Sequence, residues 1–88
     1  MKLLKNLPKV RLKAIGFTDG NECVASECAA LSLRRAKYVR DWFLEHGVPK
    51  ERLDEPEGRG SNEPIDTNET EEGRQRNRRA EVSPVFMP

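Results

Sequence analysis

The sequence has few of the residues on which several common activities depend. It carries two cysteines, one histidine, one tryptophan, one tyrosine and three phenylalanines in 88 residues. A zinc site usually needs about four ligands, and His46 lies far along the chain from both cysteines, so no metal centre is expected. The few aromatic side chains offer no platform on which nucleic-acid bases could stack.

An excess of charge of one sign and a long apolar stretch are also absent. Lysine and arginine number 16 against 15 acidic residues, which leaves a net charge of +1 and gives no general attraction to polyanions. No apolar run is long enough to cross a membrane, and the opening MKLLKNLPK has no apolar core of signal-peptide length. Neither a nucleophile–base pair nor a phosphate loop is visible. We therefore expect one small domain with a thin core that is not an enzyme.

The first half of the chain contains the two strongest secondary-structure signals. Alternating apolar residues predict a strand from Lys9 to Gly16, closed by the turn residues Thr18-Asp19-Gly20. Ile15 breaks the alternation, which indicates that the end of this strand is covered on both faces. An apolar stripe with helical spacing predicts a long helix over Ala29–His46, which Gly47 terminates.

The second half gives weaker signals of the same kind. A weak strand is expected around Arg52-Leu53, and a short helix capped by Thr70 over Glu71–Arg78. Arg79–Phe86 predicts a closing strand with Ala80 and Val82 facing inward and Val85 as a further candidate. Pro84 restricts this strand to a sheet edge or to its first half. Because helices follow strands along the chain, the sequence predicts an α+β fold. We expect a two-layer α/β sandwich with its helices packed on one face of a small mixed sheet.

Both cysteines lie in the polar loop that joins the first strand to the long helix. Cys23 and Cys28 are five positions apart. A disulfide between them would close a small ring, worth about 2 kcal/mol in the chain-entropy model. Two free buried thiols are the alternative at this point.

Three motifs resemble those of a known family. The strand ends in Gly16-Phe17-Thr18-Asp19, and the long helix contains Leu31-Ser32 followed by Arg35-Ala36. A late run contains Asn68, Thr70, Gly73, Arg74, Asn77, Arg78 and Arg79. In this order the motifs resemble the OmpA-like peptidoglycan-binding domain, which occurs in OmpA C-terminal regions, peptidoglycan-associated lipoproteins and flagellar stator proteins of the MotB type. Together they cover roughly seventy residues, which makes the match specific.

The resemblance implies an OmpA C-terminal-like sandwich that binds peptidoglycan non-covalently and without a cofactor. In the family, the aspartate pairs with the amino group of diaminopimelate in the stem peptide, and the arginine holds a carboxylate of the same residue. These roles fall on Asp19 and Arg35. A fixed acid beside a planar guanidinium matches an ammonium and a carboxylate on one carbon. Thr18 would fix the backbone around Asp19, and Asn77 and Arg78 are secondary ligand candidates.

The resemblance also implies a cellular location and a disulfide. A domain of this kind works in the periplasm, associated with the outer membrane, and reaches a membrane only through an anchor or a parent protein. Since the periplasm is oxidising, the resemblance favours a Cys23–Cys28 disulfide.

The sequence departs from the family pattern in three places. The family domain normally begins with a further strand and helix. We interpret residues 1–88 as a single domain that lacks this strand and most of this helix, with Met1–Pro8 as the tail of the helix. The missing strand leaves a sheet edge open, which predicts self-association. The spacing from acid to arginine is one residue longer than usual, and Cys28 stands about where the family often has an asparagine.

Simpler roles compete with ligand binding at each position. Asp19 is also a typical turn residue, and Arg35 could be a solvated helix residue. The arginines 74, 78 and 79 could serve only in structural ion pairs. A function of another class, an arginine-rich nucleic-acid-binding or protein-interaction module, would use the segment GRQRNRRAE at positions 73–81. Glutamates at positions 69, 71, 72 and 81 surround that segment, so no nucleic-acid partner is expected.

Overall fold

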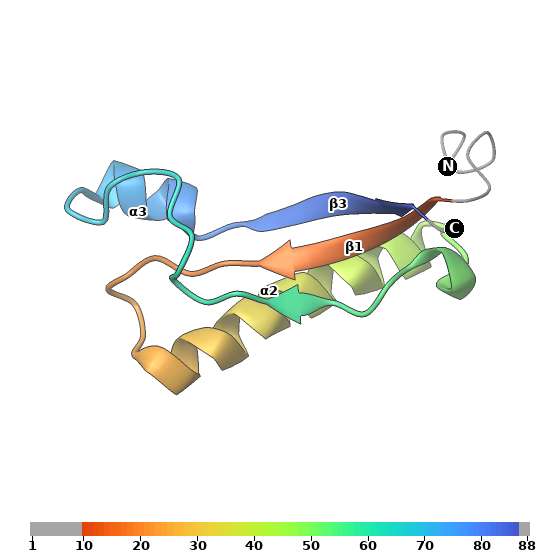
Figure 1. The fold of residues 1–88 in the computed structure, drawn as a ribbon, viewed down its shortest axis with the longest axis horizontal. Coiled ribbons are helices and arrows are strands. Elements are labelled where there is room, and N and C mark those ends of the chain that lie inside the picture. Colours follow the sequence, from red (N-terminus) through yellow and green to blue (C-terminus); the bar gives the residue numbers. More distant parts are fainter. Residues whose placement is uncertain (1–9, 87–88) are drawn as a thin grey trace.

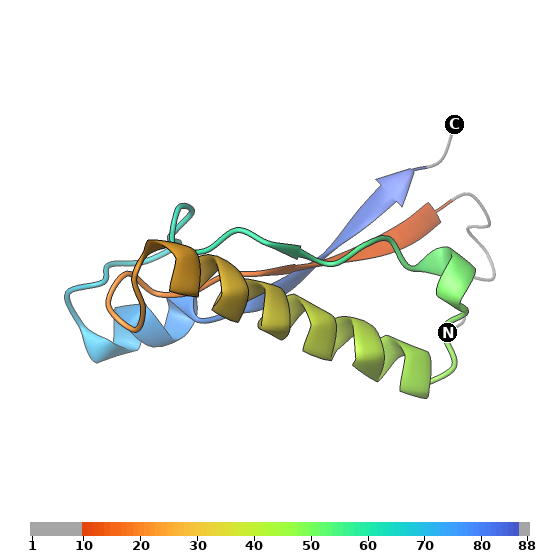
Figure 2. The same ribbon diagram turned by 90° about the horizontal axis from the view of Figure 1, so that it is seen from below.

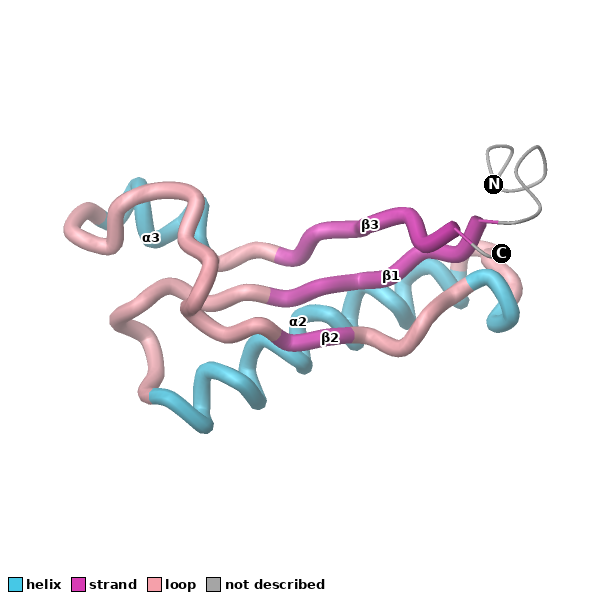
Figure 3. Tube along the Cα trace, in the orientation of Figure 1, coloured by secondary structure: helices cyan, strands magenta, loops and turns pink. Residues whose placement is uncertain are grey.

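A three-stranded mixed sheet forms the frame of the protein. The computed structural model describes residues 10–86, and the interpretation of Met1–Pro8 lies outside that range. Strand β1 (Val10–Gly16) is central, parallel to β2 (Glu57–Gly58) and antiparallel to β3 (Ala80–Phe86). Figures 1 and 3 show the strands in the order β2-β1-β3. The predicted α+β fold with a small mixed sheet is confirmed.

Helix α2 (Ala25–Glu45) lies along one face of this sheet, as the second view shows (Figure 2). It begins four residues before the predicted start. The carbonyl of Val24 already accepts hydrogen bonds from the backbone N–H groups of Glu27 and Cys28, so the end of the polar loop is helical. Gly47 follows with a φ of +92°, a conformation that suits glycine, and the predicted termination there is confirmed. No helix in the described range is long and apolar enough to span a membrane.

Small residues allow α2 to pack closely on β1. A Cβ added to Gly16 would lie 1.8 Å from the carbonyl oxygen of Ser32, so only glycine fits at the crossing. The hydroxyl of Ser32 is fully buried, donates to the carbonyl of Ala29 and accepts from the N–H of Gly60. Because α2 begins about two turns before Ser32, this residue neither caps the helix nor lies in its first turn. Ser32 instead ties the helix to the loop after β2.

The core is thin, as the length of the chain predicts. Its buried hydrophobic residues are Val10, Ala14, Ile15, Phe17, Cys28, Ala36 and Val48. The burial of Ile15 agrees with a strand end that is covered on both faces. Ala80 and Val82 are exposed, so the expectation that they face inward is wrong. Among the described residues β3 is an edge strand that pairs only with β1, and this edge position accommodates Pro84.

The second half of the chain supplies short elements at both ends of β1. The weak strand expected at Arg52-Leu53 is a 3₁₀ turn over Lys50–Arg52, followed by a single bridge from Leu53 to Leu12. Helix α3 (Glu71–Asn77) begins as predicted, since the hydroxyl of Thr70 accepts from the N–H of Gly73 at 3.0 Å. Both views place α3 and the start of α2 at the same end of the molecule (Figures 1 and 2).

Candidate site at the end of strand β1

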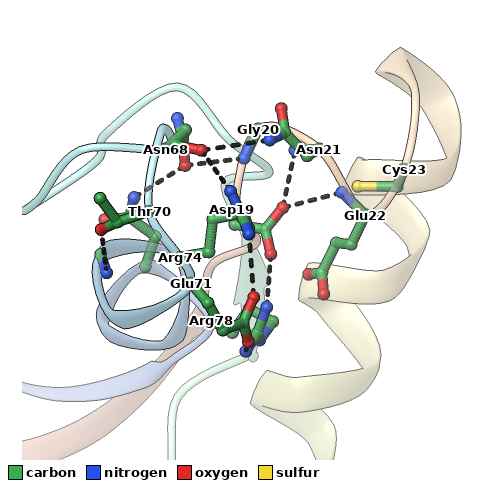
Figure 4. Close-up of polar contacts among 12 residues, drawn as sticks. Asp19, Gly20, Asn21, Glu22, Cys23, Asn68, Thr70, Glu71, Arg74 and Arg78 are labelled. Atoms are coloured by element: carbon green, nitrogen blue, oxygen red, sulfur yellow. Dashed lines mark hydrogen bonds and ion pairs between the residues drawn. The ribbon is translucent and has the colours of Figure 1, made fainter.

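Asp19 is the centre of a dense hydrogen-bond network just beyond β1. Its side chain is 1% exposed. One carboxylate oxygen accepts from the backbone N–H groups of Asn21 at 2.6 Å and Glu22 at 2.7 Å. The other accepts from Arg78 Nη1 at 2.9 Å, and Figure 4 shows the three bonds converging on the acid. The turn role considered for Asp19 is therefore real, and it is combined with a buried ion pair.

This environment keeps the Asp19 carboxylate charged. Burial by itself raises the pKa of a carboxyl group. The hydrogen bonds from Asn21, Arg78 and Glu22, together with the positive charge of Arg78, outweigh that effect and lower the pKa of Asp19 below its ordinary value. A negative charge thus stands at the end of β1 at neutral pH, with a single guanidinium directly opposite one of its oxygens.

Arg35 reaches the same end of the sheet from helix α2. Its Nη1 donates to the carbonyl oxygen of Phe17 at 2.8 Å. The guanidinium also grips the carboxylate of Glu22 with two bonds, of 2.5 Å and 3.1 Å. Since Glu22 also donates its backbone N–H to Asp19, a single loop residue bridges the predicted acid and the predicted arginine. The neighbouring Arg34 is exposed and has no hydrogen bond or ion pair with the described part of the chain.

Arg78 connects this site to helix α3. Besides Asp19, it donates to Glu71 Oε1 at 2.5 Å, and these two acids raise the pKa of Arg78. Arg74 bonds Glu71 and the carbonyl of Asn68, and Arg79 bonds Glu81. Each of these three arginines therefore forms an ion pair within the domain, as the purely structural alternative predicts. The ligand role assigned to Arg78 stays a prediction.

Asn77 holds the loop before α3 in place. Its side chain is fully buried, and its carbonyl oxygen accepts from the backbone N–H groups of Ile65 and Asp66. Its amide nitrogen donates to the carbonyl of Asp66 and to Asn68 Oδ1. That oxygen also accepts from the N–H of Gly20, so the late motif is physically linked to the loop around Asp19. The contacts of Asn77 are those of a positioning residue, and its ligand role stays a prediction.

Thr18 contributes through its backbone. Its N–H donates to the carbonyl of Gly60 at 2.9 Å, which fixes the chain one residue before Asp19. Its hydroxyl is buried and has no hydrogen-bond partner in the described part of the chain. A buried hydroxyl without a partner is unusual, and the supporting role assigned to Thr18 stays a prediction.

The predicted Cys23–Cys28 disulfide is confirmed. Its Cα atoms are 5.2 Å apart, and it joins the loop after Asp19 to the first turns of α2. A shallow hollow of about 600 Å³ borders Cys28 on one side, lined also by Ala29 and residues 57–63. It includes neither Asp19 nor Arg35 and is separate from the charged site. Within residues 10–86 no cluster of side chains suits a metal ion.

Sequence reasoning missed three residues that build the site, namely Glu22, Asn68 and Glu71. The spacing of Glu22 from Asp19 gives a partial signal, because an aspartate in a turn commonly accepts from N–H groups two and three residues ahead. Nothing local indicates that the Glu22 carboxylate reaches Arg35, thirteen positions along the chain. That contact exists only because the loop folds back along α2.

The fold and the charged site together define a class of protein: a small α+β domain with a buried acid at the end of its central strand and an arginine on the facing helix. A family model described as the OmpA family matches residues 1–78. The chain therefore belongs to the OmpA family, which confirms the resemblance drawn from its motifs.

Individual relatives agree with this assignment. The chain is 40% identical over 81 residues to the peptidoglycan-binding protein ArfA of Mycobacterium tuberculosis, covering 90% of this chain and 24% of that protein. It is 40% identical over 74 residues to outer membrane protein A of Bordetella avium, covering 82% and 36%. The chain thus spans about a quarter to a third of the length of these relatives.

Solved structures show the same fold. The C-terminal domain of Helicobacter pylori MotB superposes with a TM-score of 0.83 at 28% identity, covering 99% of this chain and 68% of that one. The peptidoglycan-associated lipoprotein of Burkholderia pseudomallei gives a TM-score of 0.83 at 25% identity, covering 96% and 70%.

Proposed function

We propose that this domain binds peptidoglycan non-covalently, through the diaminopimelate residue of the stem peptide, and so anchors an envelope protein to the cell wall. The observation that carries the proposal is the two-point grip of Arg35 on a carboxylate, one loop residue away from the charged Asp19. A guanidinium that already binds one carboxylate in this manner has the position and geometry to bind another. The relative named as a peptidoglycan-binding protein supports the same assignment.

Diaminopimelate matches the charges of the site. Its side chain ends in an ammonium and a carboxylate on one carbon, which call for an acid and a guanidinium side by side. Asp19 would take the ammonium, and Arg35 the carboxylate. Thr18, Asn77 and Arg78 would support the ligand from around Asp19. The relative named as an outer membrane protein favours a periplasmic location, associated with the outer membrane, for this chain as well.

The arginine-rich segment offers little support for nucleic-acid binding. Each of its arginines pairs with a carboxylate of the domain, the acids being Glu71, Asp66, Asp19 and Glu81. Arginines neutralised in this way present no basic stripe to a phosphate backbone. We therefore assign the segment a structural role and expect no retention on heparin at physiological salt.

Substitution of Arg35 tests the proposed function. We expect Arg35→Ala to weaken binding of a soluble diaminopimelate-containing muropeptide by about 2 kcal/mol or more, roughly thirtyfold in Kd, because the ligand carboxylate loses its partner. Arg35→Lys should also weaken binding, because an ammonium cannot make the two-point grip. Calorimetric titration measures the effect, and co-sedimentation with purified sacculi extends it to the intact wall.

Arg34→Ala is the matched control, one position away on the same helix and without a partner within residues 10–86. It should bind like the parent protein. Equal affinity of a folded Arg35→Ala variant and the parent would rule out the assigned site.

A further inference from the structure

The carboxylate position on Arg35 is occupied by the chain itself. Glu22 Oε1 lies 2.5 Å from Nη1 and Oε2 lies 3.1 Å from Nη2, which is the paired arrangement that a guanidinium makes with any carboxylate. A ligand carboxylate that binds Arg35 in the same way has to replace Glu22. The two side chains are 27% and 20% exposed, so the pair is accessible from solvent.

The backbone of Glu22 is also fixed close to Arg35, so that its carboxylate can bind Arg35 again after a displacement. Its backbone N–H donates to Asp19 at 2.7 Å, and the next residue, Cys23, is joined by the disulfide to Cys28 in α2. Figure 4 shows Glu22 between Asp19 and the start of this helix. A tethered group has a high effective concentration at its partner, so the Glu22 carboxylate competes strongly with a free one.

Glu22 is not needed to orient Arg35. The same guanidinium nitrogen bonds the carbonyl of Phe17 at 2.8 Å, a backbone group fixed at the end of the central strand. If Glu22 left, Arg35 would still be anchored to the sheet. This contact distinguishes a competitor from a positioning residue, because loss of a competitor strengthens binding and loss of a positioning residue weakens it.

Glu22 contacts both charges of the site. Its carboxylate pairs with Arg35, and its N–H donates to the Asp19 oxygen that also accepts from Asn21, while Arg78 pairs with the other oxygen. Displacement of Glu22 would therefore free Arg35 from its carboxylate and remove one of the three hydrogen bonds to Asp19. A ligand with an ammonium and a carboxylate on one carbon gains from both, whereas a simple anion or a simple cation gains from one.

We propose that Glu22 is a resident competitor that closes the site and makes it selective for a zwitterionic amino-acid centre. The proposal rests on the proposed function of Asp19 and Arg35. In the unliganded domain Glu22 occupies the place of the ligand carboxylate, so the apparent affinity is reduced by the fraction of molecules in the closed state.

Glu22→Gln is the decisive variant, because it keeps the size of the side chain and removes its charge. We expect it to bind a tripeptide stem that ends in meso-diaminopimelate about five- to tenfold more tightly than the parent. A stem that ends in lysine has an ammonium without the carboxylate on the same carbon, and its binding should change less than twofold. Glu27→Gln, an exposed acid in the first turn of the same helix, is the control and should match the parent.

Each result either supports or contradicts the competitor role of Glu22. Tighter binding by Glu22→Gln supports the proposal, and so does binding by this variant alone when the parent shows none. A second outcome is that the parent binds, Arg35→Ala abolishes binding, and Glu22→Gln binds with the same or a lower affinity than the parent. In that case Glu22 is not a competitor, and the proposed function stands. If neither the parent nor Glu22→Gln binds, both inferences are wrong. Thermal unfolding of each variant establishes that it is folded.

Discussion

At the scale of single residues, the site depends on buried polar groups that are almost all paired. Asp19 receives three hydrogen bonds, and Asn77 makes four with the loop before α3. Buried polar groups stabilise a fold only when they are satisfied in this way. The binding residues therefore form part of the fold, and a substitution at the site has to be checked for stability before its effect on binding is interpreted.

Asp19→Asn should show how far the charge of this acid stabilises the domain. The folded-state pKa of Asp19 lies below its unfolded value of about 3.9. Its contribution is thus fully present above that unfolded value and is lost as the pH falls through the lower folded value. We expect the variant to be less stable than the parent at pH 7, and the difference to shrink as the pH falls below about 4.

Denaturant unfolding of both proteins across this pH range measures the effect. The difference between parent and variant isolates Asp19 from other acids with a lowered pKa, such as Glu71. Glu55→Gln, at an exposed acid with no ion pair in the described range, should leave stability unchanged at every pH. A gap between parent and Asp19→Asn that is the same at pH 7 and pH 3 would contradict the prediction.

At the scale of elements, the domain is held together where α2 meets the sheet and where its first turns meet the loop. Gly16 and Gly58 let the helix approach the strands so closely that a Cβ at either would clash with Ser32 or Leu33. At the start of the helix the disulfide holds the loop against α2, because the loop between Asp19 and α2 has few apolar contacts. Its residues Gly20, Asn21, Glu22 and Val24 are all exposed.

Removal of the disulfide should lower the free energy of unfolding by about 2 kcal/mol, the chain-entropy value for so short a ring. The double variant Cys23→Ser/Cys28→Ser, compared with the parent in denaturant, measures this loss. Dithiothreitol should lower the stability of the parent by a similar amount and leave the double variant unaffected. Equal stability of oxidised parent and double variant would show that native contacts alone order this loop.

At the scale of the whole molecule, strand β3 forms an open edge of the sheet. In the described part of the chain it pairs with β1 alone, is seven residues long, and exposes Val82 and Phe86 at 44% and 75%. Unpaired strand edges with apolar side chains are templates for pairing with another chain. Within residues 10–86 no further strand covers this edge.

We expect this edge to pair with a second copy as the concentration rises. Sedimentation velocity across a hundredfold range of concentration should show a shift from monomer toward dimer. Val82→Lys, which places a charge on the edge, should move the shift to higher concentration. A parent protein that sediments as a monomer over the whole range would show that β3 is protected in another way.

The sequence by itself determined the order of strands and helices, the long helix and the Thr70 cap, because these follow from periodicity and from contacts between near neighbours. The Cys23–Cys28 disulfide was favoured over free thiols only through the resemblance to a periplasmic family. The motifs of the sequence also determined the family. The tertiary structure alone decided that Ser32 joins α2 to the loop after β2, that β2 is only two residues long, and that Glu22 lies on Arg35. Those outcomes depend on side chains that meet across the fold. No local pattern records such meetings, since they are fixed only when the loop, the helix and the sheet pack against one another.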